Sequence, residues 1–497
     1  MRAWRILAAL CALLAACNDE GDPQRAAEVA PDSATPSATA QAVHTTVEAL
    51  RRSGGGAGGA AGWTAPPSSA HDPGPRPPAG DAGAPYANLP PGLQTAFAAG
   101  RKDFIETEGI EEGLGPTMNL DSCGGCHSQP AFGGTSPPEN PQIAFATAGG
   151  ASNKVPAFLS LKGPVREVRF VRNADGSPDG GVHGLFSITG RDDAAGCNLA
   201  QPDFDAEQAR HNLAFRIPTP LFGSGLIENI PDREIVQNQA RSAQTKQALG
   251  IRGRPNLLLT SNSISGQPNK NGNDGTIGRF GHKAQNKSLL IFAGEAYNVE
   301  MGITNGAFPT ERDETPGCEF STSPNTDMKL DAGTEPAEAI SAIDRFTVFM
   351  RLLAPPLPSA KVNGATAESL AAGRGVFDEV GCALCHTPSL RTVKNAAVLA
   401  LRDQPVNLYS DLLLHDMGRG LADGIQQGQA GGREWRSAPL WGLGQRLFFL
   451  HDGRTADLRQ AIAEHYSEGS EANGVTRRFF GLPGAQQQDV LNFLRSL

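Results

Sequence analysis

The chain has 497 residues, with 52 acidic and 43 basic side chains and a formal net charge of -9. This acidic balance, without a dense basic run, argues against nucleic acid as a partner. The length allows about three domains, although the composition shows that part of the chain is not globular.

The N-terminus has the pattern of an export signal. Arg2 and Arg5 precede an apolar run over residues 6–16, which is too short to span a membrane. The run ends in Leu-Ala-Ala before Cys17, and this sequence resembles the bacterial lipobox. We expect residues 1–16 to be a signal peptide and Cys17 to carry a lipid. The protein would then be an exported lipoprotein with a periplasm-facing anchor in the inner or the outer membrane.

Residues 17–89 are rich in Ala, Pro, Ser and Gly, including a glycine run at 54–59 and a proline run at 73–78. Such a composition buries too little apolar surface to offset the entropy lost on ordering the chain. We expect a lipid-anchored, disordered tether that lifts the globular part off the membrane.

A C-x-x-C-H motif occurs twice, as Cys123, Cys126, His127 and as Cys382, Cys385, His386. In this motif each thiol forms a thioether with a haem vinyl group, and the histidine binds iron on the proximal side. A redox C-x-x-C has no reason to carry histidine at the next position twice. Zinc sites built from two C-x-x-C pairs usually close over a gap of roughly 15–20 residues, much shorter than the gap here. The motifs therefore predict two covalently bound c-type haems.

Residues 128–278 form a long stretch rich in Gly, Pro, Asn and Asp. Within it, residues 165–171 and 257–260 have the pattern of short strands, and residues 205–215 and 232–249 have that of helices. We interpret the stretch as a loop-rich insertion in the first haem domain.

The sequence repeats itself before the two haem motifs. Gly100 and Phe104 precede the first motif and Gly373 and Phe377 the second, each within the same Ala-Ala-Gly-Arg context. Glycine and phenylalanine at this spacing share one face of a helix, which we expect to pack near the haem.

A helix predicted over residues 341–354 ends at the proline cluster 355–358, and a terminal helix is expected at 486–497. We therefore expect a mainly α fold of two cytochrome-c-like haem domains. The first would span residues 90–355, including the insertion with its few short strands, and the second residues 356–497.

A fainter repeat distinguishes the two haem sites. Phe280, His282 and Leu289 recur at the same spacing as Phe449, His451 and Leu458. In the second copy the following helix would place His465 on its apolar face, toward the second haem. At the same offset the first copy has Ala296, which cannot bind iron. The first haem would therefore have an open or weakly ligated position.

Of the eight cysteines, Cys197 and Cys318 remain once the signal, the lipobox and the haem motifs are assigned. In an oxidising compartment such a pair is most simply a disulfide.

Further motifs occur in order along the folded part, at residues 113–116, 278–281, 301–304, 408–418, 439–444 and 450–454. In combination they resemble the bacterial di-haem oxidoreductase family, whose members are described as peroxidases and sometimes as thiol oxidoreductases. The resemblance covers residues 90–497.

More distantly, the chain resembles the bacterial di-haem cytochrome c peroxidases and the di-haem enzyme that oxidises a precursor of methylamine dehydrogenase. This resemblance implies a peroxidatic first haem and a C-terminal haem that transfers electrons. It places His465 at the distal ligand of the C-terminal haem, and it matches Glu300 and Met301 to a distal Glu-Met pair. Glu300 would then be the catalytic acid–base that moves a proton between the two peroxide oxygens.

Other residues compete for the position of distal ligand. Met417, His415 and Tyr466 are alternatives at the second haem, and His282 is an alternative at the first. A buried histidine bonded to a propionate or a backbone group is the simpler interpretation of His415.

We expect a di-haem oxidoreductase of cytochrome c peroxidase type, which reduces hydrogen peroxide at its first haem. The second haem would relay electrons from a small periplasmic carrier, a cytochrome c or a copper protein. Trp435 and Trp441 could form an electron bridge, although a core aromatic is the simpler interpretation. The alternatives are a di-haem oxidase of a protein or organic substrate and a non-catalytic periplasmic electron-transfer cytochrome. The distant resemblance also allows calcium, which no run of oxygen ligands in this sequence supports.

Overall fold

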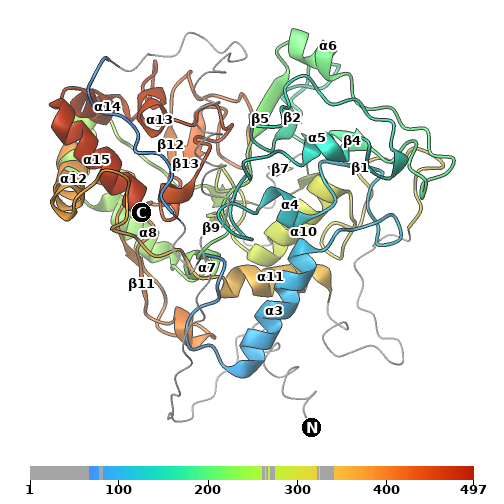
Figure 1. The fold of residues 1–497 in the computed structure, drawn as a ribbon, viewed down its shortest axis with the longest axis horizontal. Helices are drawn as coiled ribbons and strands as arrows, with labels where there is room; N and C mark the ends of the chain where they lie inside the picture. Colours follow the sequence, from blue (N-terminus) through green and yellow to red (C-terminus); the bar gives the residue numbers. More distant parts are fainter. Residues whose placement is uncertain are drawn as a thin grey trace.

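The computed structural model describes residues 66–77, 82–259, 263–264, 267–268, 275–321, 324 and 341–497 (Figure 1). Helices form most of the regular structure and the strands are short, as expected for a mainly α fold. The predicted signal peptide, Cys17 and most of the predicted tether lie outside the described residues. Within the described part of the chain, no helix is long and apolar enough to cross a membrane.

The described α-helices are α3 (Pro91–Ile105), α4 (Cys123–Cys126), α5 (Gln142–Phe145), α6 (Phe204–Ala209), α7 (Ser224–Glu228), α8 (Asp232–Ala240), α9 (Ala243–Leu249), α10 (Leu289–Met301), α11 (Ala342–Leu352), α12 (Ala367–Val380), α13 (Leu458–Glu464), α14 (Asn473–Phe480) and α15 (Gly484–Ser496). Short 3₁₀ turns are η1 (Ala148–Gly150), η2 (Cys382–Leu384), η3 (Leu399–Leu401) and η4 (Leu443–Gln445).

The described strands are β1 (Thr117–Met118), β2 (Glu167–Phe170), β3 (Val182–His183), β4 (Phe186–Ser187), β5 (Leu213–Arg216), β6 (Leu257–Leu258), β7 (Ser263–Ile264), β8 (Gln267–Pro268), β9 (Thr276–Ile277), β10 (Leu390–Arg391), β11 (Pro405–Val406), β12 (Leu414–Asp416) and β13 (Glu434–Arg436). They form a three-stranded sheet of order β3-β2-β5 and the pairs β1-β4, β6-β9, β7-β8, β10-β11 and β12-β13. All of these pairings are antiparallel.

Each haem motif follows a helix that packs closely across a second helix. α3 crosses α11, where a Cβ on Gly100 would lie 2.3 Å from the backbone oxygen of Arg345. α12 crosses α15, where a Cβ on Gly373 would lie 1.9 Å from the backbone oxygen of Asp489. The repeated glycine therefore allows both helix pairs to approach closely. Figure 1 shows the first pair at the lower centre and the second at the left.

The hydrophobic residues form two main cores. The smaller core contains Phe377 and Phe493 and lies under α12 and α15. The larger core contains Phe104 and Phe349, but it also takes Leu390 and Leu413 from the chain beyond the proline cluster. The boundary predicted at residue 355 therefore does not separate the two cores.

Two predicted helices of the insertion differ from the structure. Residues 205–215 form α6 and then β5, which pairs with β2 in the sheet, so strand pairing replaces the second half of the helix. Residues 232–249 divide into α8 and α9 at Ser242, whose φ of 55° is left-handed and cannot continue a right-handed helix. The predicted strands are shorter than expected, β2 and β6, and residue 260 lies outside the described residues.

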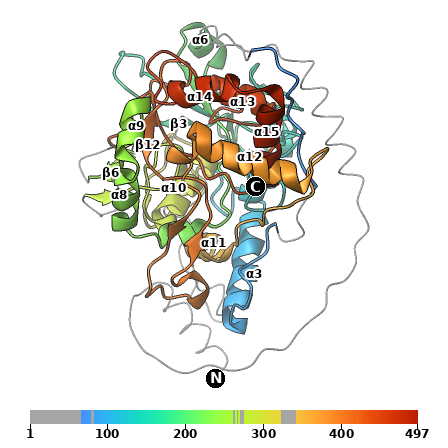
Figure 2. The same cartoon turned by 90° about the vertical axis from the view of Figure 1, so that its left-hand side faces the viewer.

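Residues 66–77 were expected to belong to a disordered tether. Instead they pack against the folded part of the chain. Asp72 is 2% exposed and forms a double ion pair with Arg495 of α15, with nitrogen–oxygen distances of 2.6 and 2.7 Å. Its Oδ2 also accepts the backbone N–H of Leu458, the first residue of α13, at 2.9 Å. The backbone N–H of Arg76 binds the carbonyl of Gly444 at 2.8 Å. This segment, drawn in blue, runs beside α15 in both views (Figures 1 and 2).

A disulfide joins Cys197 to Cys318, the pair expected from the sequence. Both cysteines are buried in the larger core. The bond closes a loop with a sequence separation of 121 residues, which contains α10 and the three-stranded sheet's last strand.

Candidate functional site

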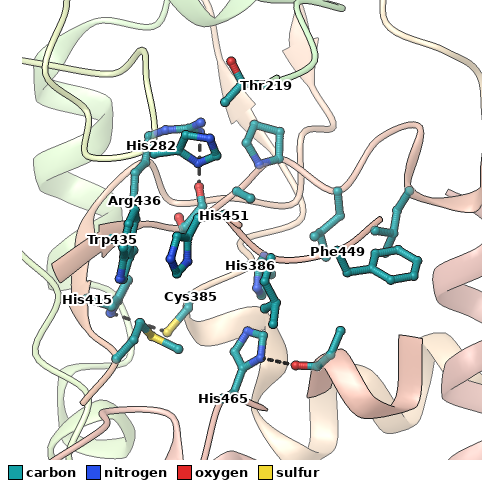
Figure 3. A pocket seen from close by; sticks show the side chains of 18 of the residues that line it. Thr219, His282, Cys385, His386, His415, Trp435, Arg436, Phe449, His451 and His465 are labelled. Atoms are coloured by element: carbon teal, nitrogen blue, oxygen red, sulfur yellow. Dashed lines mark hydrogen bonds between the residues drawn. The ribbon is translucent and has the colours of Figure 1, made fainter. Parts of the chain in front are cut away.

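The two C-x-x-C-H motifs line two different cavities. The first motif borders a cavity with about 150 Å³ of water-accessible space. The second borders a larger cavity of about 290 Å³, part of which Figure 3 shows. Since each cavity receives one motif, the four motif cysteines cannot share one zinc ion. The two cavities have a common wall, formed by Ile217, Pro218, Thr219, Leu221, Gly281, His282 and Phe292.

The histidines of the two motifs are held in the same way. His127 Nδ1 donates to the carbonyl of Gly134 at 3.0 Å, and His386 Nδ1 donates to the carbonyl of Tyr409 at 3.0 Å. A carbonyl only accepts, so in both rings the lone pair is on Nε2. Burial lowers the pKa of His127, and it lowers the pKa of His386 to about 4, so both imidazoles are neutral. A neutral ring with Nδ1 already bonded is the usual form of a histidine that binds metal.

The four motif cysteines form no disulfide, in contrast to Cys197 and Cys318. Cys123 and Cys126 are the ends of the one-turn helix α4, and the second motif forms the turn η2. Burial raises the pKa of Cys123 and of Cys382 to about 12. Two thiols and one imidazole nitrogen bordering an apolar cavity are the donor set that a c-type haem requires, so the residues present fit this cofactor at both sites.

The helices α10 and α13 line the two cavities in the same register. From α13, Ala461, Ile462 and His465 border the second cavity, and from α10, Phe292, Ala293 and Ala296 border the first. Each helix follows a turn closed by a backbone bridge, Phe280 to Asn286 in the first copy and Phe449 to Thr455 in the second. The repeat seen in the sequence is therefore a repeat of structure, and Ala296 occupies the position of His465.

His465 is the C-cap residue directly after α13 and lies beside His386 in the second cavity (Figure 3). Its Nδ1 donates to the carbonyl of Ala461 at 2.8 Å, which leaves the lone pair on Nε2. Burial lowers its pKa, so the ring is neutral. The second cavity thus contains two imidazoles of the same tautomer, as a site with two histidine ligands requires.

Glu300 extends from α10 into the first cavity, one turn beyond Ala296. Its Oε2 accepts the side-chain N–H of Asn119 at 2.7 Å, and its carboxyl group contacts that of Glu167. Burial and the charge of Glu167 raise the pKa of Glu300 well above its usual value. Burial alone would also raise the pKa of Glu167, but the guanidinium groups of Arg169 and Arg216 outweigh it and lower that pKa. The arginines beside Glu167 therefore favour a charged Glu167 and a protonated Glu300 when the two carboxyl groups share one proton.

The other candidate ligands are engaged differently. His415 is bonded through both ring nitrogens, to Asp411 at 3.1 Å and to Glu471 at 3.0 Å. His282 borders both cavities, and its Nε2 donates to the carbonyl of Ile217 at 3.0 Å. Met417 borders the second cavity with its side chain.

Trp435 borders the second cavity, and its ring contacts one stacked histidine and two cationic side chains. The ring of His451 stacks on it at 3.8 Å between centroids (Figure 3). Lys283 Nζ lies 4.0 Å and the Arg216 guanidinium 5.4 Å from its ring centroid. Asp423 pairs with both cations, at 2.8 Å from Arg216 and 3.1 Å from Lys283. Trp441 borders the same cavity, but it packs in the larger core.

Sequence reasoning missed Glu167 and Arg169. They lie on β2, and the alternation of these two charged residues with Val168 and Phe170 was visible within the predicted strand. Because alternate residues of a strand point to the same face, this pattern would place Glu167 and Arg169 on one face of the strand. Their proximity to Glu300 depends on the packing of the sheet beside α10, which no local pattern indicates.

Comparison with known proteins gives one family. A model described as "Di-haem oxidoreductase, putative peroxidase" matches residues 181–497. No curated protein matches the chain. Among solved structures, the chain is similar to hydrazine synthase of Kuenenia stuttgartiensis pressurized with xenon, at 15% identity and a TM-score of 0.19, over 31% of this chain and 55% of that one. The chain thus spans about half the length of that protein.

Proposed function

Because the chain belongs to the di-haem oxidoreductase family, we propose that it is a peroxidase that carries two c-type haems. Cys123 and Cys126 would hold the first haem by thioether bonds, and Cys382 and Cys385 would hold the second. His127 and His386 would be the proximal ligands. Each haem would occupy a cytochrome-c-like unit, built around the helix pairs α3–α11 and α12–α15. When bound, the haems supply the iron and the exchange of electrons.

The difference between the two cavities carries the proposal. On the helix that faces each proposed haem, the second cavity has His465 and the first has Ala296 at the same position. A haem with two histidine ligands suits electron transfer, whereas peroxide needs an open position. Hydrogen peroxide would therefore react in the first cavity, with electrons relayed from the second.

Glu300 and Glu167 would manage the protons of this reaction. Glu167, Glu295 and Glu300 all border the first cavity. Glu300 lies one turn beyond Ala296 on α10, and Glu167 is an ionised neighbour in contact with it. As Glu300 takes a proton from one peroxide oxygen, its own proton can pass to Glu167, and the pair can then deliver a proton to the leaving oxygen. General acid–base catalysis of this kind typically contributes about 10²–10⁴-fold.

Electrons would enter at the second site from a small periplasmic carrier, a cytochrome c or a copper protein. The wall shared by the two cavities would carry these electrons, since His282 borders both. Trp435 lies edge-on to His282, at 6.2 Å between ring centroids, and would extend this connection into the second cavity. A lipid on Cys17 would keep the protein at a periplasm-facing membrane surface.

The decisive measurement is the ferric absorption and EPR spectrum of the purified holoprotein. An open first haem predicts a high-spin component that changes on addition of peroxide, beside a low-spin second haem. If both irons are low-spin in the oxidised and half-reduced forms, and peroxide leaves the spectrum unchanged, the protein is a non-catalytic electron-transfer cytochrome instead.

Glu300→Gln tests the acid–base role in the same preparation. Peroxide turnover should fall by about 10²–10⁴-fold while both haem spectra remain those of the parent protein. Glu111→Gln, a change of an exposed carboxylate, should leave turnover intact. Equal turnover in the two variants would remove Glu300 from the mechanism.

A further inference from the structure

Two partly buried arginines border the second cavity, and the described residues give neither an acidic partner. Arg436 ends β13, and Arg446 follows the turn η4. The guanidinium of Arg436 donates to the carbonyls of Gly281 and Ser437, at 3.0 and 3.3 Å, and that of Arg446 donates to the carbonyl of Pro439 at 3.3 Å. Among the described residues, neither forms a salt bridge, and the Nε of Arg446 is buried with no partner.

Three fully buried arginines of this chain, by contrast, pair with carboxylates. Arg495 pairs with Asp72, Arg216 pairs with Asp423, and Arg279 pairs with Asp232. Burial lowers the pKa of both Arg436 and Arg446, to about 10, and for Arg436 the neighbouring charge of Arg446 adds to this effect. Two like charges held close together out of water are strongly unfavourable unless an anion joins them. The wall of the second cavity therefore carries two neighbouring positive charges that no carboxylate among the described residues balances.

We propose that Arg436 and Arg446 bind the propionate groups of the haem attached at Cys382 and Cys385. This inference rests on the proposed function, because it assumes that haem. A guanidinium presents a planar fork of N–H donors that matches a carboxylate, and a haem carries two carboxylates at one edge. Both arginines border the cavity of the second motif, and neither is among the residues that border the first.

The pair would also tune the second haem. Positive charge beside the propionates disfavours the oxidised, more positive state of the iron, so it raises the midpoint potential. Removing one guanidinium should therefore lower the midpoint potential of the second haem and leave that of the first nearly unchanged, because electrostatic effects weaken with distance.

The test uses the holoprotein and spectroelectrochemical titration of both haems. Arg446→Gln and Arg436→Gln should each change the ferric–ferrous equilibrium constant of the second haem by about tenfold toward the ferric form, which is about 59 mV for one electron. Arg446→Lys, which retains the charge but loses the fork, should restore most of the potential. Arg433→Gln, a change of an exposed arginine on the turn before β13, is the matched control and should alter neither haem.

Resonance Raman spectra keep the proposal testable if the glutamine variants fail to fold. The propionate bending band of the second haem should shift in Arg446→Lys and not in Arg433→Gln. Unchanged potentials and an unchanged band in variants that retain two haems would overturn the proposal. Saturable binding of inorganic phosphate would also overturn the proposal if Arg446→Lys abolished it and left the propionate band unchanged. The arginine pair would then bind a free anion rather than the propionates. These outcomes are independent of peroxide turnover, so the proposed function can stand if this inference fails.

Discussion

Glu167 and Glu300 bring two carboxyl groups into contact, and the charges around the two groups differ. Arginines surround Glu167, whereas Glu300 faces the apolar cavity and an amide. Glu300 was a candidate from the sequence because Glu300 and Met301 match the distal Glu-Met pair of the distantly similar peroxidases. Glu167 could not, because it comes from a strand far along the chain, and its proximity depends on tertiary packing.

Glu167→Gln tests how the carboxyl pair works. Removing the charge of Glu167 should lower the pKa of Glu300, because that charge helps to raise it. Turnover that needs a proton on the pair is lost as the pH rises through this pKa. The alkaline limb of the kcat/KM profile should therefore move to lower pH, and the maximal rate should fall because the proton acceptor is gone. An unchanged alkaline limb would show that Glu167 and Glu300 do not share a proton during turnover.

Glu108 gives a prediction about stability. It is 8% exposed and accepts the hydroxyl of Tyr297 at 2.9 Å, and burial raises its pKa from 4.5 to about 7. Between these two pH values the folded protein binds a proton that the unfolded chain has released, so stability falls as the pH rises through this window and the loss is complete above it. Glu108→Gln should remove up to about 3 kcal/mol of this fall.

The measurement is urea denaturation of the holoprotein at about pH 5 and about pH 8, on either side of the upper pKa. The free energy of unfolding of the variant should change less between the two pH values than that of the parent protein. Glu111→Gln, at an exposed position, should keep the parental difference. If Glu108→Gln also keeps it, the carboxyl group is not protonated in the folded state.

Among the secondary-structure elements, the helices were predicted best where the sequence repeats. α3 and α12 follow from the repeated Gly and Phe, and α13 follows from its apolar face. The helix expected at 205–215 was wrong in its second half because β5 gains its stability from pairing with β2, which hydrophobic spacing along one segment does not reveal.

The segment 66–77 was also misjudged, for a different reason. Its composition resembles that of a linker, and its order depends on a few specific contacts rather than on buried apolar area. Asp72 neutralises Arg495 and caps the first N–H of α13, so it connects the chain before the first haem motif to the helix that carries His465.

Asp72→Asn should destabilise the protein by about 3–5 kcal/mol, because it leaves a buried guanidinium without its counter-charge. The loss should appear as a lower midpoint of thermal unfolding, together with a partial change of the second haem from low spin to high spin if α13 moves. His71→Ala, on the exposed side of the same segment, is the control. An unfolding midpoint equal to that of the control would show that the Asp72–Arg495 pair contributes little.

On the scale of the whole molecule, the sequence predicted two haem motifs, and each of them lines a cavity of its own. It did not predict that the two cavities share a wall, because Ile217 and Leu221 come from the stretch interpreted as an insertion. The insertion is therefore part of both sites rather than a surface elaboration of the first. The larger core is also shared, because residues on both sides of the proline cluster fill it.

The loop closed by the Cys197–Cys318 bond contains all seven residues of this shared wall. Replacing both cysteines by alanine should lower the free energy of unfolding by about 2–4 kcal/mol, because the unfolded chain regains the entropy that the closed loop removes. Denaturant titration of the oxidised parent, the reduced parent and the variant measures the effect. The reduced parent should behave like the variant, and the haem spectra of all three should agree. Equal stability of the oxidised parent and the variant would contradict the prediction.

The neighbours of Trp435 have a consequence for how charge crosses the molecule. Lys283 and Arg216 contribute two positive charges beside the indole, and Asp423 cancels one of them. The remaining positive charge makes loss of an electron from the ring unfavourable, because it would place a second cation in a buried space. In the proposed electron relay a hole on Trp435 would therefore be unfavourable, and electrons would pass the indole by tunnelling rather than by oxidising it.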